Sequence, residues 1–353
     1  AVVRTDMLGD FIIWLGVAES LREVFPDRTG RLILIANTSW SDFATEFPYW
    51  DDVIRVDVNR LFRNPWYRFR MFLGIRMQGF SMIVAPQFSH DHDLSDAFVR
   101  VSGAPRRVGQ SGDSTYLNTA ERRRVKSWYT ELIDTPASMT GEMERNAYFF
   151  RKLGAENAEP CLPRLTERTV PSRFGLPDKF FVLAPGAAFA GRRWPPGHFA
   201  EISRLLVEQT GWAGVICGGR DEKQIASEII SNGNGGLVDL TGQTSVSELI
   251  ALVSNSRLLI GNESGPVHIA VALGVSALCI LGGGHFGRFM PYDANMMDDR
   301  PIPIPCYELM ECFHCNWECK YPLGETGAVR CVESVSVSSV WEKIVPLLRG
   351  AGQ

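Results

Sequence analysis

The chain has 353 residues, of which 45% are hydrophobic and 22% charged, and its formal net charge is −4. This length predicts about two domains, each large enough to fold without disulfides or metals. The negative net charge argues against a nucleic-acid-binding protein, because such proteins need a basic face. No apolar run reaches the roughly 18 to 20 residues of a membrane helix, and no secretory signal precedes Ala1, so we expect a soluble, cytoplasmic protein.

The first half alternates short β-branched runs with helical stretches, which is typical of a parallel α/β domain. The predicted strands are Ala1–Arg4, Arg31–Ala36, Val53–Val56 and Ser81–Ala85, with Arg107–Gly109 as a last edge strand. The predicted helices are Phe11–Phe25, Asn64–Gln78 and Asp91–Ser102. We therefore expect a Rossmann-like N-terminal domain over residues 1–158.

The second half repeats this alternation more regularly. Its predicted strands are Phe180–Ala184, Ala213–Cys217, Leu237–Leu240, Leu258–Ile260 and Ala277–Leu281. The predicted helices between them are Pro196–Gln209, Asp221–Ser231, Ser245–Ser254 and Ser264–Leu273. The proline-rich segment Gly154–Pro177 suits a linker, so a second Rossmann-like domain is expected over residues 159–353. Two doubly wound domains facing each other across a central cleft would bind ligands at the carboxyl ends of their strands.

Two polar or aromatic surface segments each have two interpretations. Arg106-Arg107 and the run from Arg122 to Lys126 form either a solvated helix face or a dock for an anionic acceptor or an acidic membrane. Trp66–Phe72 either contacts a lipid acceptor or packs internally. The dock for the arginine run and the lipid contact for Trp66–Phe72 would each make the protein peripheral to the inner face of a membrane.

The first candidate site is the turn Met7-Leu8-Gly9-Asp10 after the first strand. Gly9 tolerates positive φ and lets a ligand approach the backbone. Asp10 is either an ordinary helix N-cap or a carboxylate that serves as general base for an acceptor hydroxyl.

The second candidate site is the loop from Pro185 to Pro195, after the strand Phe180–Ala184. Gly186 and Ala187 leave room for a ligand, and their N–H groups can point at phosphate oxygens. Arg192 and Arg193 add forked cationic donors that suit a diphosphate, although they could instead be solvated surface side chains.

The third candidate site runs from Gly261 to His268 and opens a helix through Ser264, Gly265 and Pro266. Such a helix start presents backbone N–H groups and positive dipole charge to an anion. Glu263 is then expected to meet a ribose or sugar hydroxyl. His268 lies on the same helix face as Ser264 and is either a ligand contact or a packed histidine. Glu222, after the Ala213–Cys217 strand, is a further candidate for the ribose.

Together these loops resemble glycosyltransferase family 9, whose best-known members are the ADP-heptose:lipopolysaccharide heptosyltransferases. Gly9-Asp10, Pro185-Gly186-Ala187 before Arg192-Arg193-Trp194-Pro195, and the Gly261–His268 motif occur in the family's order and spacing. Glu263 stands where the family usually has Asp, and Ala187 and Ala188 stand where heptosyltransferases tend to have hydroxyl side chains.

The resemblance implies a GT-B fold and inverting transfer of a sugar, with heptose first among the candidates. The donor would be a nucleotide-diphosphate sugar such as ADP-heptose, and the acceptor a hydroxyl on a glycan, glycolipid or protein. It implies that Asp10 is the catalytic base and that Arg192 binds phosphate. It also implies that Glu222 binds the ribose and that the helix start at Ser264, Gly265 and His268 binds phosphate. Because an arginine and a helix start supply positive charge, no cofactor is expected for the transfer itself.

Five of the eight cysteines fall within residues 306–331, at Cys306, Cys312, Cys315, Cys319 and Cys331. Cys312, Cys315, Cys319 and Cys331 could close a tetrahedral structural site for zinc or iron, with Cys306 as an alternative ligand. Disulfides and free thiols are the other two possibilities. The resemblance extends here, since some family 9 relatives that modify autotransporter proteins also have cysteine-rich tails.

Three other functions fit the sequence less well. A sugar-nucleotide epimerase of GT-B fold would need several acids and bases around the sugar, and only Asp10 is well placed. A non-catalytic nucleotide-sugar-binding or scaffold protein would not need Gly9-Asp10 and Arg192. An NAD dehydrogenase would need a Gly-x-Gly-x-x-Gly turn after a strand, which is missing.

Overall fold

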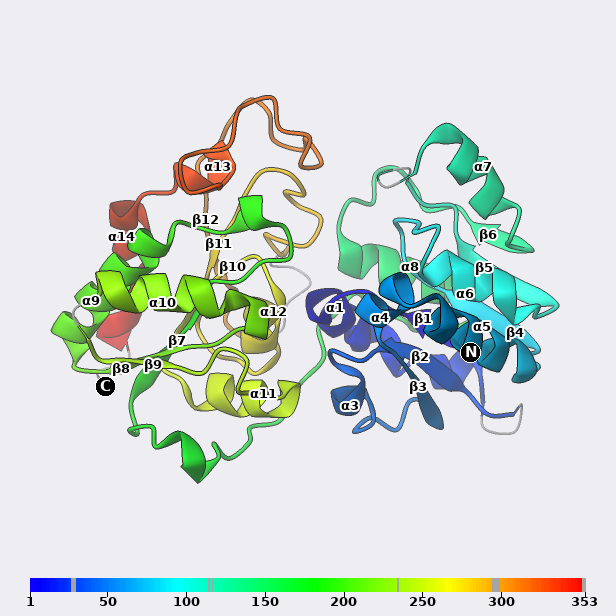
Figure 1. The fold of residues 1–353 in the computed structure, drawn as a ribbon, viewed down its shortest axis with the longest axis horizontal. Coiled ribbons are helices and arrows are strands. Elements are labelled where there is room, and N and C mark those ends of the chain that lie inside the picture. Colours follow the sequence, from blue (N-terminus) through cyan, green and yellow to red (C-terminus); the bar gives the residue numbers. More distant parts are fainter. Residues whose placement is uncertain (27–29, 114, 116, 234, 294–298, 351–353) are drawn as a thin grey trace. The chain divides into compact units, whose positions relative to one another are not determined.

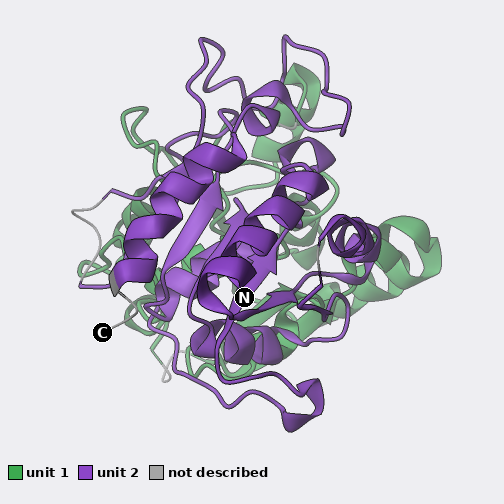
Figure 2. Ribbon diagram, turned by 90° about the vertical axis from the view of Figure 1, so that its left-hand side faces the viewer, with its two compact units in different colours: residues 1–162 green, residues 163–353 purple. Residues whose placement is uncertain are grey.

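The structure is a computed structural model that describes residues 1–26, 30–113, 115, 117–233, 235–293 and 299–350. The chain divides into two compact units, Ala1–Leu162 and Pro163–Gln353. The change of unit lies within the proline-rich segment 154–177, and Figure 2 colours the two units separately. Figure 1 labels the helices and strands of each unit.

Unit 1 is built on a six-stranded parallel sheet with strand order β3-β2-β1-β4-β5-β6. Its strands are β1 (Val2–Arg4), β2 (Ile33–Asn37), β3 (Asp52–Val56), β4 (Met82–Ala85), β5 (Arg106–Gln110) and β6 (Glu131–Ile133). Its helices are α1 (Leu8–Ala18), α2 (Leu21–Val24), α3 (Ser41–Ala44), α4 (Val58–Arg63), α5 (Pro65–Met77), α6 (Ser95–Ser102), α7 (Thr119–Lys126) and α8 (Glu142–Leu153). The central strands are buried on both faces, which explains their continuous apolar runs.

Unit 2 has a second six-stranded parallel sheet, with strand order β12-β11-β10-β7-β8-β9. Its strands are β7 (Phe180–Ala184), β8 (Ala213–Ile216), β9 (Leu237–Asp239), β10 (Leu259–Asn262), β11 (Ala277–Ile280) and β12 (Ile304–Cys306). Its α-helices are α9 (Pro196–Thr210), α10 (Lys223–Asn232), α11 (Val246–Asn255), α12 (Gly265–Ala272), α13 (Arg330–Glu333) and α14 (Val337–Gly350). Short 3-10 turns are η2 (Ser172–Phe174), η3 (Ala190–Arg192) and η4 (Arg220–Glu222).

Both sheets reverse their winding direction in the middle, and this reversal decides where ligands can bind. In unit 1 the chain winds outward from β1 and then restarts at β4 beside it, and in unit 2 it does the same at β7 and β10. Right-handed crossovers then place helices on both faces of each sheet. The loops after β1, β7 and β10 therefore open at the carboxyl ends of the strands where the winding reverses, as in other doubly wound folds.

Aromatic side chains fill the interior of each unit. In unit 1 the rings of Phe11 and Trp40 stack with centroids 3.9 Å apart, and Trp14 packs beside Trp50. In unit 2 the fully buried Trp194 packs on Phe199 and donates its indole N–H to the carbonyl of Val335 at 2.8 Å. Trp194 lies near the end of the predicted phosphate loop, so the core anchors that end.

The parallel α/β pattern predicted from the sequence is confirmed, but three details were wrong. The predicted helix Phe11–Phe25 is interrupted, because α1 ends at Ala18 and α2 begins at Leu21. Arg107–Gly109 belongs to β5, which is not an edge strand because β6 pairs with it. The edge strands β6 and β12 were missed; each has only three residues, and β12 contains Pro305, which is tolerated at an edge.

Candidate functional site

The turn after β1 places Asp10 in the first turn of α1, where it is half-buried. Met7, not Asp10, is the N-cap residue, and Gly9 lies in the helical first turn rather than at positive φ. The capping interpretation of Asp10 was therefore wrong. A carboxylate in the first helical turn is stabilised in its charged form by the helix dipole.

Beside this turn lies a buried charged group that the sequence analysis missed. Arg4 is 1% exposed, and its guanidinium contacts the Asp6 carboxylate at 2.7 Å and donates to the carbonyl oxygen of Asp10 at 3.0 Å. Burial raises the pKa of Asp6 to about 7, against the lowering effect of Arg4, and the carboxylates of Asp10 and Glu142 raise it further. Arg4 and Asp6 thus fix the backbone at Asp10 and add a second acidic group next to it.

In unit 2, Asn262 joins the two loops at the winding reversal. Its side chain is fully buried at the end of β10, its Nδ2 donates to the Pro185 carbonyl at 2.6 Å, and its Oδ1 accepts from the Trp194 N–H at 3.0 Å. Asn262 therefore holds both ends of the predicted phosphate loop, a role that the sequence alone did not reveal. The only signal for it was its place between Gly261 and Glu263 in the motif.

Arg192 and Glu263 form an ion pair at this same place. Arg192 Nη2 lies 3.0 Å from Glu263 Oε2 and donates to the Glu263 carbonyl oxygen at 2.6 Å. Glu263 is 4% exposed and orients Arg192, while its expected contact with a sugar hydroxyl stays a prediction. Arg192 Nε is buried and has no hydrogen-bond partner among the described residues, which leaves a cationic donor for an anion.

Ser264 and Gly265 begin α12 next to this ion pair. Ser264 is the N-cap, and its hydroxyl donates to the Asn262 carbonyl at 3.2 Å instead of capping the helix. Pro266 follows at the second helical position, where a missing N–H is tolerated. The backbone N–H groups of a helix start and its dipole favour an anionic ligand, so this part of the prediction has the expected local geometry.

His268 lies deeper than expected for a ligand contact. It is 3% exposed, and its Nδ1 hydrogen-bonds the Tyr292 hydroxyl. Burial, followed by the charge on Arg192, lowers its pKa to about 3, so the ring is neutral at physiological pH. In this structure His268 is a buried residue of α12 that packs against Tyr292, and the charge on Arg192 helps to keep its ring neutral.

Glu222 and Arg193 flank the other side of the phosphate loop. A side chain added at Gly186 would overlap the Glu222 carboxylate, so the loops after β7 and β8 are in contact there. Glu222 accepts from the Gly219 N–H at 2.7 Å, and burial raises its pKa while the charge on Arg193 lowers it. Arg193 Nε donates to the Ala187 carbonyl at 3.0 Å. The structure therefore gathers Gly186, Ala187, Arg193 and Glu222 around one loop.

The cysteine-rich segment 306–331 contains no disulfide, and all eight cysteines, each within the described part of the chain, are free thiols. Burial, followed by negative charge on Cys315, Cys331 and Cys312, raises the pKa of Cys319 to about 11, so these four thiols lie near one another. Cys306 is 1% exposed and belongs to the hydrophobic core. Among the described residues no three His, Cys, Asp or Glu side chains are arranged as metal ligands. The donor chemistry fits zinc or iron, but the arrangement is not that of a closed site.

The structure is therefore a doubly wound α/β protein with an acidic turn at one winding reversal and a cationic loop and a helix start at the other. Residues 89–307 match the family model for glycosyltransferase family 9 (heptosyltransferase). Lipooligosaccharide heptosyltransferase 2 of Haemophilus ducreyi is 33% identical over 77% of this chain and 79% of its own length.

Two solved structures share the fold. E. coli ADP-heptose lps heptosyltransferase II is 15% identical with a TM-score of 0.69, over 100% of this chain and 99% of its own. The iron-containing dodecameric glycosyltransferase TibC from enterotoxigenic E. coli is 16% identical with a TM-score of 0.57, over 99% of this chain and 76% of its own.

The chain belongs to glycosyltransferase family 9. It is a glycosyltransferase with the GT-B fold, and the family, fold and enzyme class predicted from the sequence are confirmed.

The raised pKa of Asp6 gives a pH-dependent stability that can be measured. Between about pH 4 and pH 7 the folded protein keeps a proton that unfolded Asp6 releases, so the free energy of unfolding falls as pH rises. In Asp6→Asn this contribution is absent. Urea unfolding at pH 4, 5, 6 and 7 should show wild type losing stability relative to Asp6→Asn, by at most about 1.4 kcal/mol per pH unit. Parallel pH curves for the two proteins would contradict the shifted ionisation, even if Asp6→Asn is uniformly less stable from loss of the Arg4 contact.

Proposed function

We propose that this protein transfers heptose from ADP-heptose to a hydroxyl group of a lipopolysaccharide-type acceptor, with inversion at the anomeric carbon. The observation that carries the proposal is the 33% identity to lipooligosaccharide heptosyltransferase 2, which extends over most of both chains. The name of the E. coli relative, ADP-heptose lps heptosyltransferase II, supports the same donor and acceptor class. A glycan or protein acceptor is the alternative.

In the proposed reaction unit 1 binds the acceptor and unit 2 binds the donor. Asp10 removes the proton from the acceptor hydroxyl as that oxygen attacks the anomeric carbon. The bond from that carbon to the diphosphate oxygen breaks, and negative charge grows on the leaving nucleoside diphosphate. An inverting displacement needs the base and the leaving group on opposite faces of the sugar. In this proposal unit 1 supplies the base and unit 2 binds the leaving diphosphate.

The leaving diphosphate is stabilised by groups in unit 2. Arg192 and the Ser264–Gly265 backbone supply positive charge and N–H donors, supported by the ion pair of Arg192 with Glu263. Gly186 and Ala187 let the diphosphate approach the backbone, and Arg193 adds a second cation. Glu222 is proposed to bind the ribose, which is supported by its place next to Gly186. Glu263 acts by orienting Arg192. These groups supply the positive charge without a divalent cation.

Substitution of the proposed base tests this division of roles. Asp10→Ala should lower the rate of heptose transfer by about 10²- to 10⁴-fold, because the proposed general base is lost. Its affinity for ADP, measured by thermal shift or calorimetry, should stay within about twofold of wild type, since a nucleotide in unit 2 does not depend on Asp10. Arg192→Ala should show the opposite pattern, with weakened ADP binding. Wild-type turnover in Asp10→Ala would remove this residue from the mechanism.

A panel of ADP-, UDP- and GDP-linked sugars tests the donor. We expect ADP-heptose to raise the melting temperature most, by a stabilisation of about 2.7 kcal/mol at a hundredfold excess over Kd. A larger rise in melting temperature with a UDP- or GDP-linked sugar would mean that this sugar nucleotide is the donor in place of ADP-heptose. The proposed transferase reaction would still stand.

An exposed apolar stripe supports docking on a membrane that carries the acceptor. Five large apolar side chains on α4 and α5 recur at spacings of three or four residues and are at least 45% exposed, namely Phe62, Trp66, Phe69, Leu73 and Met77. The spacing of Trp66, Phe69, Leu73 and Met77 places them along one face of α5, and Phe62 comes from α4 just before it. Exposed apolar stripes of this kind mark interaction sites. Among the described residues no helix combines the length and apolar character needed to span a bilayer.

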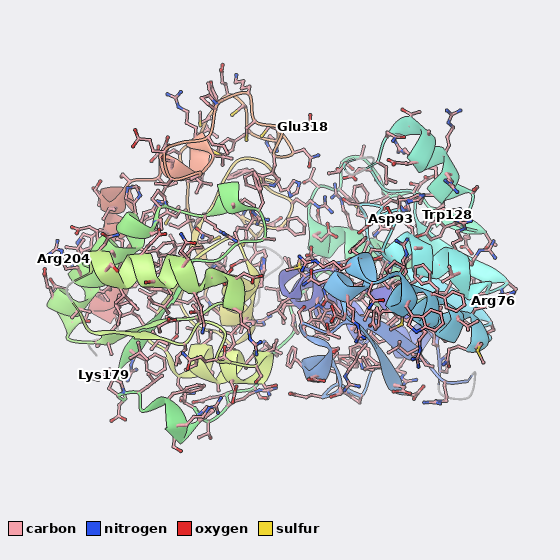
Figure 3. The ribbon with its side chains drawn as sticks, viewed as in Figure 1. Arg76, Asp93, Trp128, Lys179, Arg204 and Glu318 are labelled. Carbon is pink, nitrogen blue, oxygen red and sulfur yellow. The ribbon has the colours of Figure 1, made fainter. Side chains whose placement is uncertain are left out.

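The charge around this stripe fits an acidic phospholipid surface. The segment Val58–Met77 has no acidic residue and five arginines, at positions 60, 63, 68, 70 and 76. Arg76 lies at the outer edge of unit 1 (Figure 3), and Arg60 and Arg70 line a cavity of about 430 Å³ together with Trp66. Arginines are attracted to anionic lipids, and exposed aromatic side chains suit the membrane–water interface. Arg123 and Arg124 on α7 are also exposed, but this helix, described over its whole length, has no large exposed apolar side chain to accompany them.

Vesicle sedimentation tests the membrane proposal. Wild type should bind vesicles of phosphatidylcholine with phosphatidylglycerol more tightly than vesicles of phosphatidylcholine alone. Arg63→Gln with Arg70→Gln should lower binding to the anionic vesicles by roughly 30-fold, at about 1 kcal/mol per arginine. Trp66→Ser with Leu73→Ser should weaken binding to both kinds of vesicle. The matched control is Leu309→Ser, because Leu309 is 76% exposed in unit 2. No binding by wild type, or equal loss in the control, would overturn the proposal.

We also propose that Cys312, Cys315, Cys319 and Cys331 bind one structural iron or zinc ion. Four thiolates are a suitable donor set for either metal. Gly283 brings the two parts of the segment together, because its N–H donates to Cys331 Sγ at 3.4 Å and its carbonyl accepts from the His314 N–H at 2.7 Å. The name of TibC, an iron-containing glycosyltransferase of the same fold, supports iron. The metal would stabilise the fold of the segment and take no part in transfer.

Metal analysis of the purified protein tests this site. We expect about one equivalent of iron or zinc per chain, as for a closed four-thiolate site, and loss of it in Cys315→Ser. Cys161→Ser is the matched control, since Cys161 lies in unit 1 and donates its thiol hydrogen to the Gly16 carbonyl. Less than about half an equivalent in wild type would defeat the metal proposal.

A further inference from the structure

The cysteine-rich segment packs directly on the loop that contains Arg192. The guanidinium carbon of Arg192 lies 5.2 Å from the centre of the Trp317 ring. The centres of the Phe189 and Trp317 rings are 6.1 Å apart. The Val329 N–H donates to the Gly191 carbonyl at 2.8 Å. Segments far apart in the sequence therefore meet on both sides of the same short turn, η3.

Three consecutive glycines make this packing possible. A side chain added at Gly282 or Gly284 would overlap the Trp317 ring, and one added at Gly283 would overlap Phe313. The chain after β11 thus forms a flat floor under residues 312–317, which we call the cysteine turn. Backbone bonds fix this turn to the floor, from the His314 N–H to the Gly283 carbonyl at 2.7 Å and from the Asn316 N–H to the Gly284 carbonyl at 3.0 Å.

The cysteine turn has an unusual backbone. His314, Asn316 and Trp317 have positive φ angles of 67°, 54° and 64°, which is the left-handed region. A bulky residue such as Trp is uncommon there, and such a conformation persists only where the surrounding structure holds it. The Trp317 ring is therefore directed at Arg192 by the glycine floor and the turn, against its own backbone preference.

Arg192 is held from two sides and leaves part of its guanidinium available. Glu263 accepts two contacts from Nη2, and the Trp317 face lies against the cation. Nε has no hydrogen-bond partner among the residues that the structure describes, and the Trp317 indole N–H is likewise buried without one. A cation fixed by an ion pair and a ring, with an unpaired N–H, is arranged for an incoming anion.

We propose that Trp317 is a positioning residue for donor binding, which acts by holding Arg192 toward the donor diphosphate. The proposal rests on the proposed function, in which Arg192 binds that diphosphate. It gives the cysteine-rich segment a role in the donor site, because this segment presents the ring. A ring that fixes the guanidinium in advance lowers the cost of ordering it when the nucleotide binds.

A double-mutant cycle with ADP as the probe tests this role. Trp317→Leu should raise the Kd for ADP and the donor KM by roughly 5- to 30-fold, the range expected for a partly buried cation–π contact. The acceptor KM should stay unchanged. Trp317→Phe should restore most of the affinity because it retains an aromatic face. In an Arg192→Ala background Trp317→Leu should have no further effect on ADP affinity, since the ring acts through that arginine.

Trp341→Leu is the control for a loss of stability alone. Trp341→Leu alters a partly buried tryptophan on α14 that packs on the core of the same unit, so it should lower stability without changing ADP affinity. Unchanged ADP affinity in Trp317→Leu, or an equal loss with and without Arg192, would overturn the positioning role alone. If wild type binds no nucleoside diphosphate, the proposed function fails and this role fails with it. Thermal unfolding of each variant separates loss of fold from loss of affinity.

Discussion

The buried amide of Asn262 is the contact on which the candidate donor site depends. At the winding reversal the loops after β7 and β10 leave neighbouring strands, and no regular secondary structure holds them together. Asn262 bonds both ends of the phosphate loop, at Pro185 and Trp194, from the last residue of β10. A fully buried amide with both of its polar atoms satisfied specifies one arrangement, because any other leaves unpaired polar atoms in the core. Arg192 and the start of α12 then take their places around it.

Each unit has an arginine at its winding reversal that is paired with one carboxylate; Arg4 is buried and Arg192 is partly buried. Arg4 contacts Asp6 in unit 1, and Arg192 contacts Glu263 in unit 2. Buried ion pairs seldom add net stability, because both charges lose their hydration. In these two pairs the arginine is also bonded to a backbone carbonyl of the neighbouring turn, at Asp10 and at Glu263. The pairs therefore fix backbone geometry and leave charged groups at the ends of the strands.

The cysteine-rich segment supports one side of the predicted phosphate loop. Family motifs account for the inner side of this loop, where Asn262 and Glu263 lie. The outer side depends on Trp317, Val329 and the glycine floor, which come from the C-terminal part of the chain. These contacts are the Trp317 ring against Arg192 and the hydrogen bond from the Val329 N–H to the Gly191 carbonyl. The ring contact requires that the cysteine turn keep its shape. This requirement gives a physical reason for four thiols in a loop with little regular secondary structure.

The sequence by itself determined the fold class and most of the local geometry. Apolar runs such as Phe180–Ala184 predicted buried parallel strands, and Ser264-Gly265-Pro266 predicted a helix start after a strand, because these signals depend only on near neighbours. The short edge strands β6 and β12 had too few residues to give such a signal.

Only the tertiary structure decided which of the candidate residues work together. The pairing of Glu263 with Arg192 and the stacking of Trp317 on that arginine join residues that the sequence spacing does not connect, and the raised pKa of Asp6 comes mainly from its burial. The same holds for Gly282–Gly284, whose missing side chains have meaning only under the cysteine turn. Burial, charge and close packing depend on segments that are distant along the chain, and no local pattern records which segments will meet.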